Sequence, residues 1–355
     1  MNVYDVAVVG GGPAGSSAAS SCAEAGLKTL LLEKRSVLFW KEKPCSGIVS
    51  EETVRLIGIP KGMLRGRIEE VVLISPRNHR YRFLLEPQWL VLDRKRFDLW
   101  NLDRAKAAGA EVLTGANVVS LKKGNNGRRT IVLADRRAFS AFVLVLCMGA
   151  RSTLLDHRIH RWRDNEMLIC AQSTIDKAFR FGEDLFCIHF GGKIAPGGYA
   201  WLISTGTVSI VGLGVTLTHR KRLIDLFHSF VKRTIKVDKI DLKVQTALIP
   251  ISLRESYGEG YLITGDCAGM TDPIFGGGLL YAIRSGIYAA KVTNASVRNR
   301  DNSEGMMRDY YDFCWTNFCS YLTNRRKLRT SIYKSDQDIE AFVNNTKQFG
   351  LFYVS

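Results

Sequence analysis

The first 33 residues hold the pattern that most constrains how this chain can fold. Residues 3–9 form an apolar, β-prone run that leads directly into a glycine-rich turn, Gly-Gly-Gly-Pro-Ala-Gly, at residues 10–15. A small-residue segment continues to Gly26, and a second apolar run, 28–32, then ends at Glu33. This order of strand, glycine turn, helix, strand and acid is typical of a dinucleotide-binding βαβ unit.

The residue types of the turn match what a pyrophosphate requires. Gly10 permits a tight turn, Gly12 lets the backbone approach the phosphates, and Gly15 lets the helix lie close to the strand. Pro13 suits the first helical position, where its missing N–H costs nothing, and Ala14 follows it. The free N–H groups of that first turn and the helix dipole therefore point at the phosphates.

Glu33 stands 18 residues beyond Gly15, at the end of the second predicted strand. A carboxylate there can accept hydrogen bonds from both ribose hydroxyls, which favours an unphosphorylated ribose. Glycine-rich turns also occur in proteins that bind no nucleotide, so the turn alone is weak evidence. Its position between two apolar strands makes a bound dinucleotide, and hence a flavoprotein, the prediction.

The composition is that of an ordinary globular protein. The 355 residues are 46% hydrophobic and 24% charged, which is enough for one large or two intergrown domains. The longest uncharged apolar stretch, residues 138–150, is too short to span a bilayer, and the amino terminus enters a strand without the architecture of a signal peptide. We therefore expect a cytoplasmic protein; the alternative is a peripheral protein at the cytoplasmic face of a membrane.

The cysteines and histidines predict no metal site. None of the eight cysteines forms a CxxC pair, and several lie in apolar runs, so reduced thiols are expected. Among the six histidines, His157 and His160 have HxxH spacing, but no HExxH motif or CxxC pair accompanies them.

The net charge is the one unusual global property. Fifty basic and 34 acidic residues give +16, which implies an anionic partner. An anionic membrane, a phosphorylated substrate or an acidic electron-donor protein would each account for it, and a basic surface without a partner stays an alternative. The basic clusters lack the aromatic interleaving and the motifs of nucleic-acid binding, so no nucleic acid is expected.

Four segments together resemble the group of FAD-dependent proteins typified by p-hydroxybenzoate hydroxylase. In that group the Asp of the GDA-type motif holds the ribityl and pyrophosphate region of FAD, and the following helix N-terminus faces the flavin carbonyl. The resemblance gives this role to Asp266. The alternative is that Asp266 caps the next turn and has no contact with the cofactor. The four segments are residues 10–15 with Glu33, residues 93–98, residues 148–152, and residues 265–269 with Pro273 and residues 276–279.

Two further elements narrow the resemblance. Residues 43–47, Lys-Pro-Cys-Ser-Gly, resemble the KxCxG element of geranylgeranyl reductases, and residues 197–202, Gly-Gly-Tyr-Ala-Trp-Leu, resemble their YxWxFP element. In that family the cysteine loop lies over the substrate near the isoalloxazine ring, and the Tyr and Trp line a polyprenyl pocket. The resemblance implies these roles for Cys45, Tyr199 and Trp201; alternatively, Cys45 is a plain loop thiol and the two aromatic residues are sheet core.

The resemblance sets the candidate site residues. Cys45, for loop gating or proton relay, Tyr199, as an alternative relay, and Trp201 are the catalytic candidates, and no residue is assigned to a metal. The residues expected to bind FAD are Gly10, Gly12, Pro13, Ala14, Gly15, Glu33, Lys34, Cys45, Ser46, Gly47, Arg94, Gly265, Asp266, Gly276, Gly277, Gly278 and Leu279.

The sequence beyond the first βαβ unit predicts how the domains are organised. Residues 68–85 alternate like a β-hairpin, 142–147 are apolar enough for a central strand, and 168–215 resemble successive strands of an antiparallel sheet. The expected fold is α/β, with a Rossmann-like FAD-binding domain, an inserted antiparallel-sheet substrate domain and a helical C-terminal tail. The predicted boundaries are 1–60, 90–155 and 246–300 for the FAD-binding domain, 61–89 and 156–245 for the substrate domain, and 301–355 for the C-terminal helices.

The resemblance implies an FAD-dependent reductase that saturates double bonds of a polyprenyl lipid or lipid precursor by hydride transfer from reduced flavin. The electron donor is expected to be NAD(P)H or reduced ferredoxin. An FAD-dependent monooxygenase acting on an aromatic or isoprenoid molecule is the alternative, and a flavin-binding partner protein without turnover is a third. A halogenase is disfavoured because Tyr199 and Ser204 replace a Trp and the Pro of the WxWxIP element, and a disulfide reductase lacks its second nearby cysteine.

Two departures from the pattern bear on these expectations. Ile203 and Ser204 replace the Phe-Pro end of the aromatic element, which leaves the shape of the pocket open. Met148 stands where the wider hydroxylase group has an Asp, which makes direct use of NADPH less certain.

Overall fold

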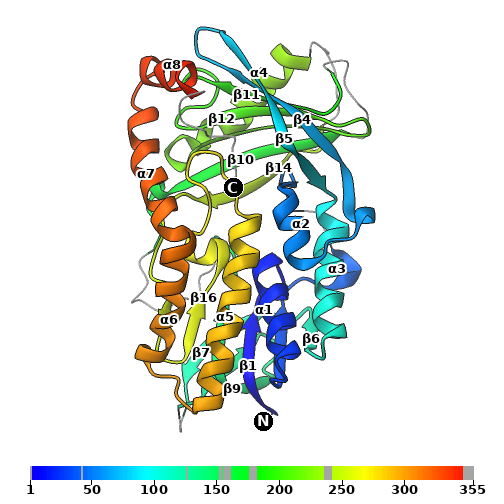
Figure 1. The fold of residues 1–355 in the computed structure, drawn as a ribbon, viewed down its shortest axis with the longest axis vertical. Helices are drawn as coiled ribbons and strands as arrows, with labels where there is room; N and C mark the ends of the chain where they lie inside the picture. Colours follow the sequence, from blue (N-terminus) through cyan, green and yellow to red (C-terminus); the bar gives the residue numbers. More distant parts are fainter. Residues whose placement is uncertain are drawn as a thin grey trace. The chain divides into compact units, whose positions relative to one another are not determined.

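The computed structural model describes residues 2–40, 43–124, 127–151, 154, 161–175, 182–235 and 242–346. Within these residues the strands form two sheets of eight strands each (Figure 1). The chain divides into two compact units, each built from three separate stretches. The first unit comprises 1–41, 95–161 and 250–324, and the second comprises 42–94, 162–249 and 325–355.

The first unit is built on a mainly parallel sheet with the strand order β15-β16-β9-β1-β2-β6, and β8 and β7 extend it from β9. Its strands are β1 (Asn2–Val9), β2 (Thr29–Glu33), β6 (Glu111–Thr114), β7 (Val118–Lys123), β8 (Arg129–Leu133), β9 (Ala138–Leu146), β15 (Tyr257–Gly258) and β16 (Tyr261–Ile263). Its helices are α1 (Pro13–Glu24), nearly all of α3 (Arg94–Ala107), α5 (Leu279–Asn299) and α6 (Glu304–Cys314), with short turns η1 (Val37–Phe39) and η5 (Gly265–Ala268).

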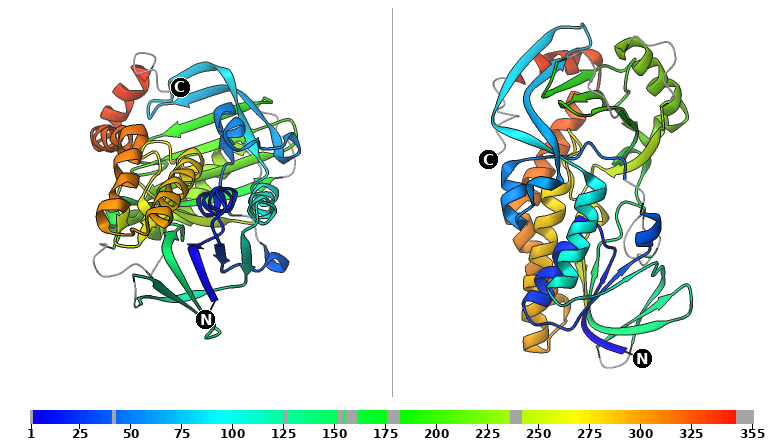
Figure 2. Two further views of the ribbon diagram at one scale, coloured as in Figure 1. Left: turned by 60° about the horizontal axis from the view of Figure 1, so that its bottom comes forward. Right: turned by 90° about the vertical axis from the view of Figure 1, so that its right-hand side faces the viewer.

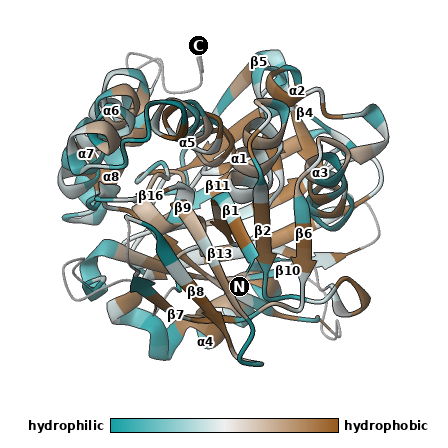
Figure 3. Cartoon of the chain, turned by 90° about the horizontal axis from the view of Figure 1, so that it is seen from below, coloured by the Kyte–Doolittle hydropathy of each residue, from teal (hydrophilic) through white to brown (hydrophobic). Residues whose placement is uncertain are grey.

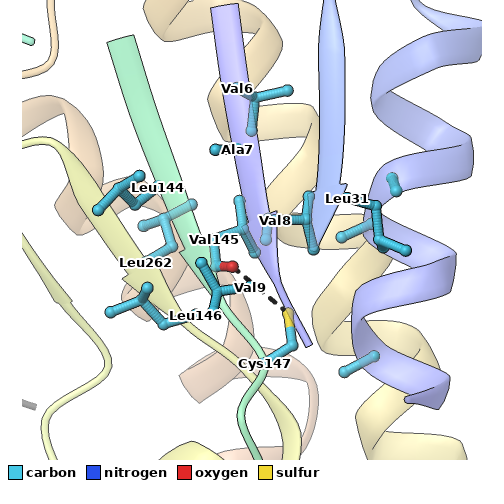
Figure 4. Close-up of a cluster of buried hydrophobic side chains, with 14 of the residues drawn as sticks. Val6, Ala7, Val8, Val9, Leu31, Leu144, Val145, Leu146, Cys147 and Leu262 are labelled. Atoms are coloured by element: carbon cyan, nitrogen blue, oxygen red, sulfur yellow. Dashed lines mark hydrogen bonds between the residues drawn. The ribbon is translucent and has the colours of Figure 1, made fainter. Parts of the chain in front are cut away.

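The centre of this sheet is the core of the first unit. β1 pairs in parallel with β2 on one side and with β9 on the other, so its residues are enclosed by backbone on both edges. Val6, Val8 and Leu144 are buried and pack with their neighbours as Figure 4 shows. Full burial of each such side chain contributes about 1.5–3 kcal/mol. The same strands are brown along most of their length in Figure 3, as expected for a parallel sheet covered on both faces.

Helices α1 and α5 lie side by side because small residues allow it (Figure 1). A Cβ atom on Gly286 of α5 would lie 2.2 Å from the carbonyl oxygen of Ala14 in α1. A Cβ on Gly15 would lie 1.8 Å from the carbonyl oxygen of Gly10. Side chains at these two glycines would push α1 away from both β1 and α5.

The second unit is a sheet with the order β14-β10-β13-β12-β11-β4-β5-β3. Its strands are β3 (Ile48–Val49), β4 (Leu64–Ile74), β5 (Arg80–Leu92), β10 (Met167–Ile175), β11 (Leu185–Phe190), β12 (Tyr199–Ser204), β13 (Ser209–Thr216) and β14 (Gln245–Pro250). Its helical segments are α2 (Glu51–Ile57), η2 (Lys61–Met63), η3 (Asp164–Glu166), η4 (Leu217–Arg222), α4 (Leu223–Ile235) and α8 (Asp336–Asn344). The long β4–β5 hairpin is seen edge-on in Figure 2.

The two faces of this second sheet carry different residues. Ala200, Leu202 and Leu213 point to the face that α4 covers with Phe227 and Phe230. The strands alternate, so the residues between these point to the opposite face. That opposite face carries the aromatic element of β12.

The predicted fold class is confirmed, with differences in detail. The 68–85 hairpin is longer than predicted, because β4 begins at Leu64 and β5 continues to Leu92. The sheet is not wholly antiparallel, because β11 pairs with β4 in parallel. In the C-terminal tail, the π-helical turn η6 (Trp315–Cys319) joins α6 to α7 (Ser320–Ile332), and residues 347–355 lie outside the described part. No helix among the described residues is long and apolar enough to cross a membrane.

Helix α8 is attached to the β4–β5 hairpin through one buried carboxylate. Glu340 is 5% exposed and accepts hydrogen bonds from the Ser75 hydroxyl (3.0 Å), the Arg77 backbone N–H (3.1 Å) and Nδ1 of His79 (2.7 Å). Burial opposes ionisation of this carboxyl, but the three hydrogen bonds outweigh it, so its pKa lies below the ordinary value. The ionised form therefore holds the carboxy-terminal helix on the hairpin.

We expect Glu340→Gln to lower the free energy of unfolding by about 1–3 kcal/mol near pH 7, because the hydrogen bonds then lose a charged acceptor. A lowered folded-state pKa means that the contribution is complete above the ordinary value and is lost as the pH falls through the folded-state pKa. Urea unfolding at several pH values measures this, with the exposed Glu255→Gln as control. A difference that persists undiminished in acid would contradict the assignment.

Candidate active site

The glycine turn lies where β1 meets α1, as a nucleotide-binding unit requires. Gly10 has φ +107°, and a Cβ on it would lie 2.4 Å from the carbonyl oxygen of Cys147. α1 begins at Pro13, and its N-cap residue Gly12 provides no side-chain cap. The first turn of α1 also carries no acidic residue. Its N–H groups are thus left for an anion, which agrees with a pyrophosphate at this helix end.

The second predicted cofactor loop lies beside this turn. Gly265 has φ +58°, and a Cβ there would lie 3.2 Å from Cβ of Ala14 and 3.4 Å from Cβ of Ala282. Asp266 follows it and is partly exposed. Its Oδ1 atom lies 3.3 Å from the position of a Cβ on Gly278, the N-cap residue of α5. The structure therefore brings the start of α1, Asp266 and the start of α5 together within the first unit.

Asp272 shapes the glycine loop before α5, and it was not predicted. Its Oδ1 accepts hydrogen bonds from the backbone N–H groups of Ile274 and Phe275, both at 2.8 Å. Its own N–H donates to the carbonyl of Gly277 (2.7 Å), and its carbonyl accepts from Gly276 (2.8 Å). These bonds close the loop that leads to Leu279, the first residue of α5. The Asp-Pro pair ahead of three glycines is the signal that could have identified it.

Glu33 lies at the end of β2, where it was predicted, but it already has partners within the chain. Its Oε2 accepts the N–H of Gly11 (2.7 Å), and its Oε1 accepts both the N–H and Nε of Arg35 (2.9 Å each). Burial opposes ionisation, but these bonds and the Arg35 charge outweigh it, so the pKa of Glu33 is lowered. Oε2 keeps a second lone pair for a ribose hydroxyl, whereas Oε1 already accepts two hydrogen bonds.

Arg35 is the functional residue of this corner that sequence reasoning missed. Its guanidinium carbon lies 3.7 Å from the ring centre of Trp40, and Nη1 lies 4.0 Å from the carboxylate of the buried Asp98. Nη1 and Nη2 are buried and form no hydrogen bond with the residues that the structure describes. Arg35 thus fixes the carboxylate of Glu33 in one orientation and leaves donors beside it. Its position two residues after the predicted acid was the available signal.

The thiols of this unit are neutral. Burial raises the pKa of Cys147 to about 12, and the Thr264 hydroxyl donates to its sulfur (2.9 Å). Burial likewise raises the pKa of Cys267 to about 11. Neither cysteine is suited to act as a nucleophile, which needs the thiolate form.

The remaining predicted cofactor residues have varied environments. Lys34 is exposed, and Arg94, the first residue of α3, is 5% exposed. Cys45 and Ser46 are partly buried in the second unit, just before β3.

The cysteine loop is held against the second sheet. Gly47 has φ +72°, and a Cβ on it would lie 2.6 Å from the carbonyl oxygen of Leu92. Gly47 also donates its N–H to the sulfur of Cys45 (3.4 Å), and Nε2 of Gln172 donates to the Cys45 carbonyl (3.2 Å). Gln172 was not predicted. It places the Cys45 loop over one face of β10.

The aromatic element lies on that same face. In the sheet, Gln172 is opposite Gly212 and Gly212 is opposite Trp201, so all three share a face. The indole lies directly on Gly212, since a Cβ there would be 2.4 Å from Cζ2 of Trp201. The Tyr199 ring is 5.7 Å from that of Trp201. The structure therefore brings Tyr199, Trp201 and the Cys45 loop to one face of the second sheet, which we call the aromatic face.

The sequence comparisons agree with both units. Residues 5–145 match the family model described as FAD dependent oxidoreductase, and residues 166–248 match the one described as geranylgeranyl reductase catalytic domain. A digeranylgeranylglycerophospholipid reductase of Methanocaldococcus jannaschii is 29% identical over 96% of this chain and 90% of its own length. The chain is therefore similar to geranylgeranyl reductases and, over its first part, to FAD-dependent oxidoreductases.

Solved structures support the same family. A geranylgeranyl bacteriochlorophyll reductase-like protein from Thermoplasma acidophilum superimposes with a TM-score of 0.86 and 26% identity, covering 97% of this chain and 91% of its own. A flavin-dependent brominase has a TM-score of 0.74 at 18% identity, covering 99% of this chain and 92% of its own, and shows a shared fold alone. The predicted family and the FAD cofactor are thereby confirmed.

FAD fits the residues of the first unit. The uncapped starts of α1 and α5 supply N–H groups, and the close packing that the glycines at 10, 15 and 265 allow brings these helix starts together. Glu33 supplies oxygens for a ribose, as the adenosine half of FAD requires. The contact of each predicted residue with FAD stays a prediction.

We expect Arg35→Met to weaken FAD binding by about tenfold or more, because Glu33 loses its charged donor and its fixed orientation. Titration of the apoprotein with FAD, followed by flavin fluorescence, measures the dissociation constant. Lys28→Met, just before the opposite end of β2, is the matched control, since the Lys28 side chain lies over the Tyr4 ring and its backbone N–H, which the variant keeps, donates to the Asp5 carboxylate. Equal affinities of the two variants would show that Arg35 has no such role.

Proposed function

We propose that this protein is an FAD-dependent reductase that saturates carbon–carbon double bonds of a polyprenyl lipid or lipid precursor. The observation that carries the proposal is the aromatic face, where Tyr199, Trp201 and the Cys45 loop meet. These residues belong to the two elements that resemble geranylgeranyl reductases, and Tyr199 and Trp201 fall within the matched catalytic domain. The curated relatives named for digeranylgeranylglycerophospholipid reduction support the same substrate class.

The aromatic face suits an isoprenoid chain. Trp201 is 8% exposed and lies flat on a strand that has glycine at two positions of this face, Gly212 and Gly214. A Cβ on Gly214 would lie 2.9 Å from the sulfur of Cys170, so this strand has no room for larger side chains. The face therefore offers ring surfaces and few polar atoms, which is what an apolar chain requires.

Saturating a double bond takes a hydride on one carbon and a proton on the other. Reduced FAD supplies the hydride from its N5 atom when it is bound. We assign the proton to the Tyr199 phenol or to the Cys45 thiol, the two groups of the aromatic face that combine partial exposure with an acidic hydrogen. Burial raises the pKa of Cys170 to about 12, so this third nearby group stays a neutral thiol.

The alternative is a monooxygenase. Its support is that a FAD-dependent monooxygenase from Pseudomonas aeruginosa superimposes with a TM-score of 0.73, although at 13% identity this shows the fold alone. The two reactions differ in the atoms that the substrate gains. A reductase adds two hydrogen atoms for each bond, and a monooxygenase adds one oxygen atom.

We therefore expect the anaerobic, dithionite-reduced holoenzyme to convert geranylgeranyl compounds into products heavier by two hydrogen atoms per bond, as mass spectrometry will show. Trp201→Ala should lower kcat/KM by about tenfold or more, because it removes a large ring from the substrate surface. Trp162→Ala, outside the aromatic element, is the control. Products that instead gain oxygen in air, with no hydrogenated product without air, would establish the monooxygenase.

For the electron donor we propose NAD(P)H or a small acidic protein such as reduced ferredoxin. The net charge of +16 supports an acidic carrier, because opposite charges accelerate the encounter. Anaerobic bleaching of the flavin by NADH, NADPH or reduced ferredoxin decides between them. A carrier that works by charge attraction reacts more slowly as salt is raised.

We also propose peripheral contact with an anionic membrane surface, where a lipid substrate would be found. The basic net charge supports it, since each Lys or Arg near such a surface contributes about 1 kcal/mol. Co-sedimentation with anionic vesicles, but not with zwitterionic ones, is the expected result. Equal sedimentation with both would remove the electrostatic basis of the proposal.

A further inference from the structure

Helix α7 buries two arginines where a helix normally buries leucines. Its buried stripe is Leu322, Arg325, Arg329 and Ile332, with the 3-4-3 spacing of a core-facing helix. Arg325 is 6% exposed and Arg329 is 3% exposed, whereas Leu328 of the same helix is only partly buried. Burying a charge costs several kcal/mol of desolvation, and a plain structural helix would place apolar residues at both positions. Both arginines have interaction partners within the chain, and Arg329 directs its guanidinium group to the second sheet.

Arg329 lies at one end of the aromatic face. Its Nη2 donates a hydrogen bond to the carbonyl of Gly197, two residues before Tyr199. Its charge also acts on Cys170, which shares a face with Tyr199 through Gly214. Arg329 is thus next to the strand that presents the tyrosine.

Helix α8 reaches the same end of the face. Phe342 of α8 packs edge-on against Phe190, with ring centres 6.2 Å apart, and Phe190 is 5.9 Å from the Tyr199 ring. Arg329 of α7 and Phe342 of α8 therefore lie at the same end of the aromatic face within the second unit.

The positive charge at this place is concentrated. Arg326 is adjacent, donates to the Asn165 carbonyl (2.7 Å), and has a pKa lowered by burial and then by the Arg329 charge. Guanidinium groups bind phosphate through paired N–H donors, more specifically than lysine does. The buried pair Arg325 and Arg329, beside an apolar ring surface, matches a molecule with a phosphate at one end and a hydrocarbon chain at the other.

We propose that Arg325 and Arg329 bind the phosphate of a phosphorylated isoprenoid whose chain lies on the aromatic face. The proposal rests on the function proposed above and adds the head group to it. The phosphate can belong to a soluble prenyl diphosphate or to a glycerophospholipid. Both present the same anionic oxygens to the arginines.

The test compares each variant on charged and uncharged substrates. Arg329→Met and Arg325→Met keep an apolar stripe on α7, so the helix retains its packing. We expect each to raise KM for geranylgeranyl diphosphate by about tenfold or more and to leave KM for geranylgeraniol unchanged. Lys327→Met, on the exposed side of α7, is the matched control and should change neither value. Equal losses on both substrates would assign the arginines to structure and overturn the proposal.

Binding to the wild-type holoenzyme tests the proposal independently of turnover and of how the variants fold. The thermal-unfolding midpoint should rise more with geranylgeranyl diphosphate than with geranylgeraniol, and equal rises would overturn the proposal. If no compound is reduced but this preference holds, the proposed reaction fails and the phosphate site stands. Repeating the titration with a geranylgeranyl glycerophospholipid in detergent micelles separates the two sources of phosphate. The natural substrate should raise the thermal-unfolding midpoint more than the other compound does.

Discussion

The close approach of α1 to its neighbours is the constraint on which the rest of the structure depends. Three glycines remove the side chains that would keep α1 from β1, from the Gly265 loop and from α5. Because they do, the uncapped N-terminus of α1 lies beside Asp266 and the start of α5. A single added Cβ at Gly15 or Gly286 would meet backbone atoms within 2.2 Å, and backbone cannot move aside cheaply.

The local parts of the fold could be predicted because each has a short sequence signature. The strand–turn–helix–strand unit follows from glycine spacing and apolar runs, and the central position of β9 follows from its continuous apolar character. The parallel pairing of β11 with β4 could not be predicted, since it joins residues about 115 positions apart. No local pattern determines which strand edge a later strand will meet.

The candidate site divides in the same way. The glycines, Glu33 and the aromatic element carry motifs, whereas Arg35 and Asp272 bond to residues within five positions without belonging to a motif. Gln172 bonds to Cys45, which only folding brings near it. Gly212 and Gly214 belong to no binding motif in the sequence, and the structure shows their role: in β13 they make room for the Trp201 indole and the Cys170 sulfur. A glycine can serve a neighbouring side chain as well as a ligand.

Buried charge links these observations to chemistry. Glu33, Arg325 and Arg329 are each less than a tenth exposed; Glu33 accepts the N–H of Gly11 in the glycine turn, and Arg329 donates to Gly197 beside the aromatic face. Stability alone would favour apolar residues at such positions, because desolvation offsets much of what a buried ion pair contributes. Ligand binding explains these charged residues better than stability does. The Glu33 carboxylate suits the sugar of a nucleotide, and the buried arginines of α7 suit the anionic end of a lipid. In the proposed site, the cationic residues that an apolar core would exclude are those that would distinguish a phosphorylated isoprenoid from a plain hydrocarbon.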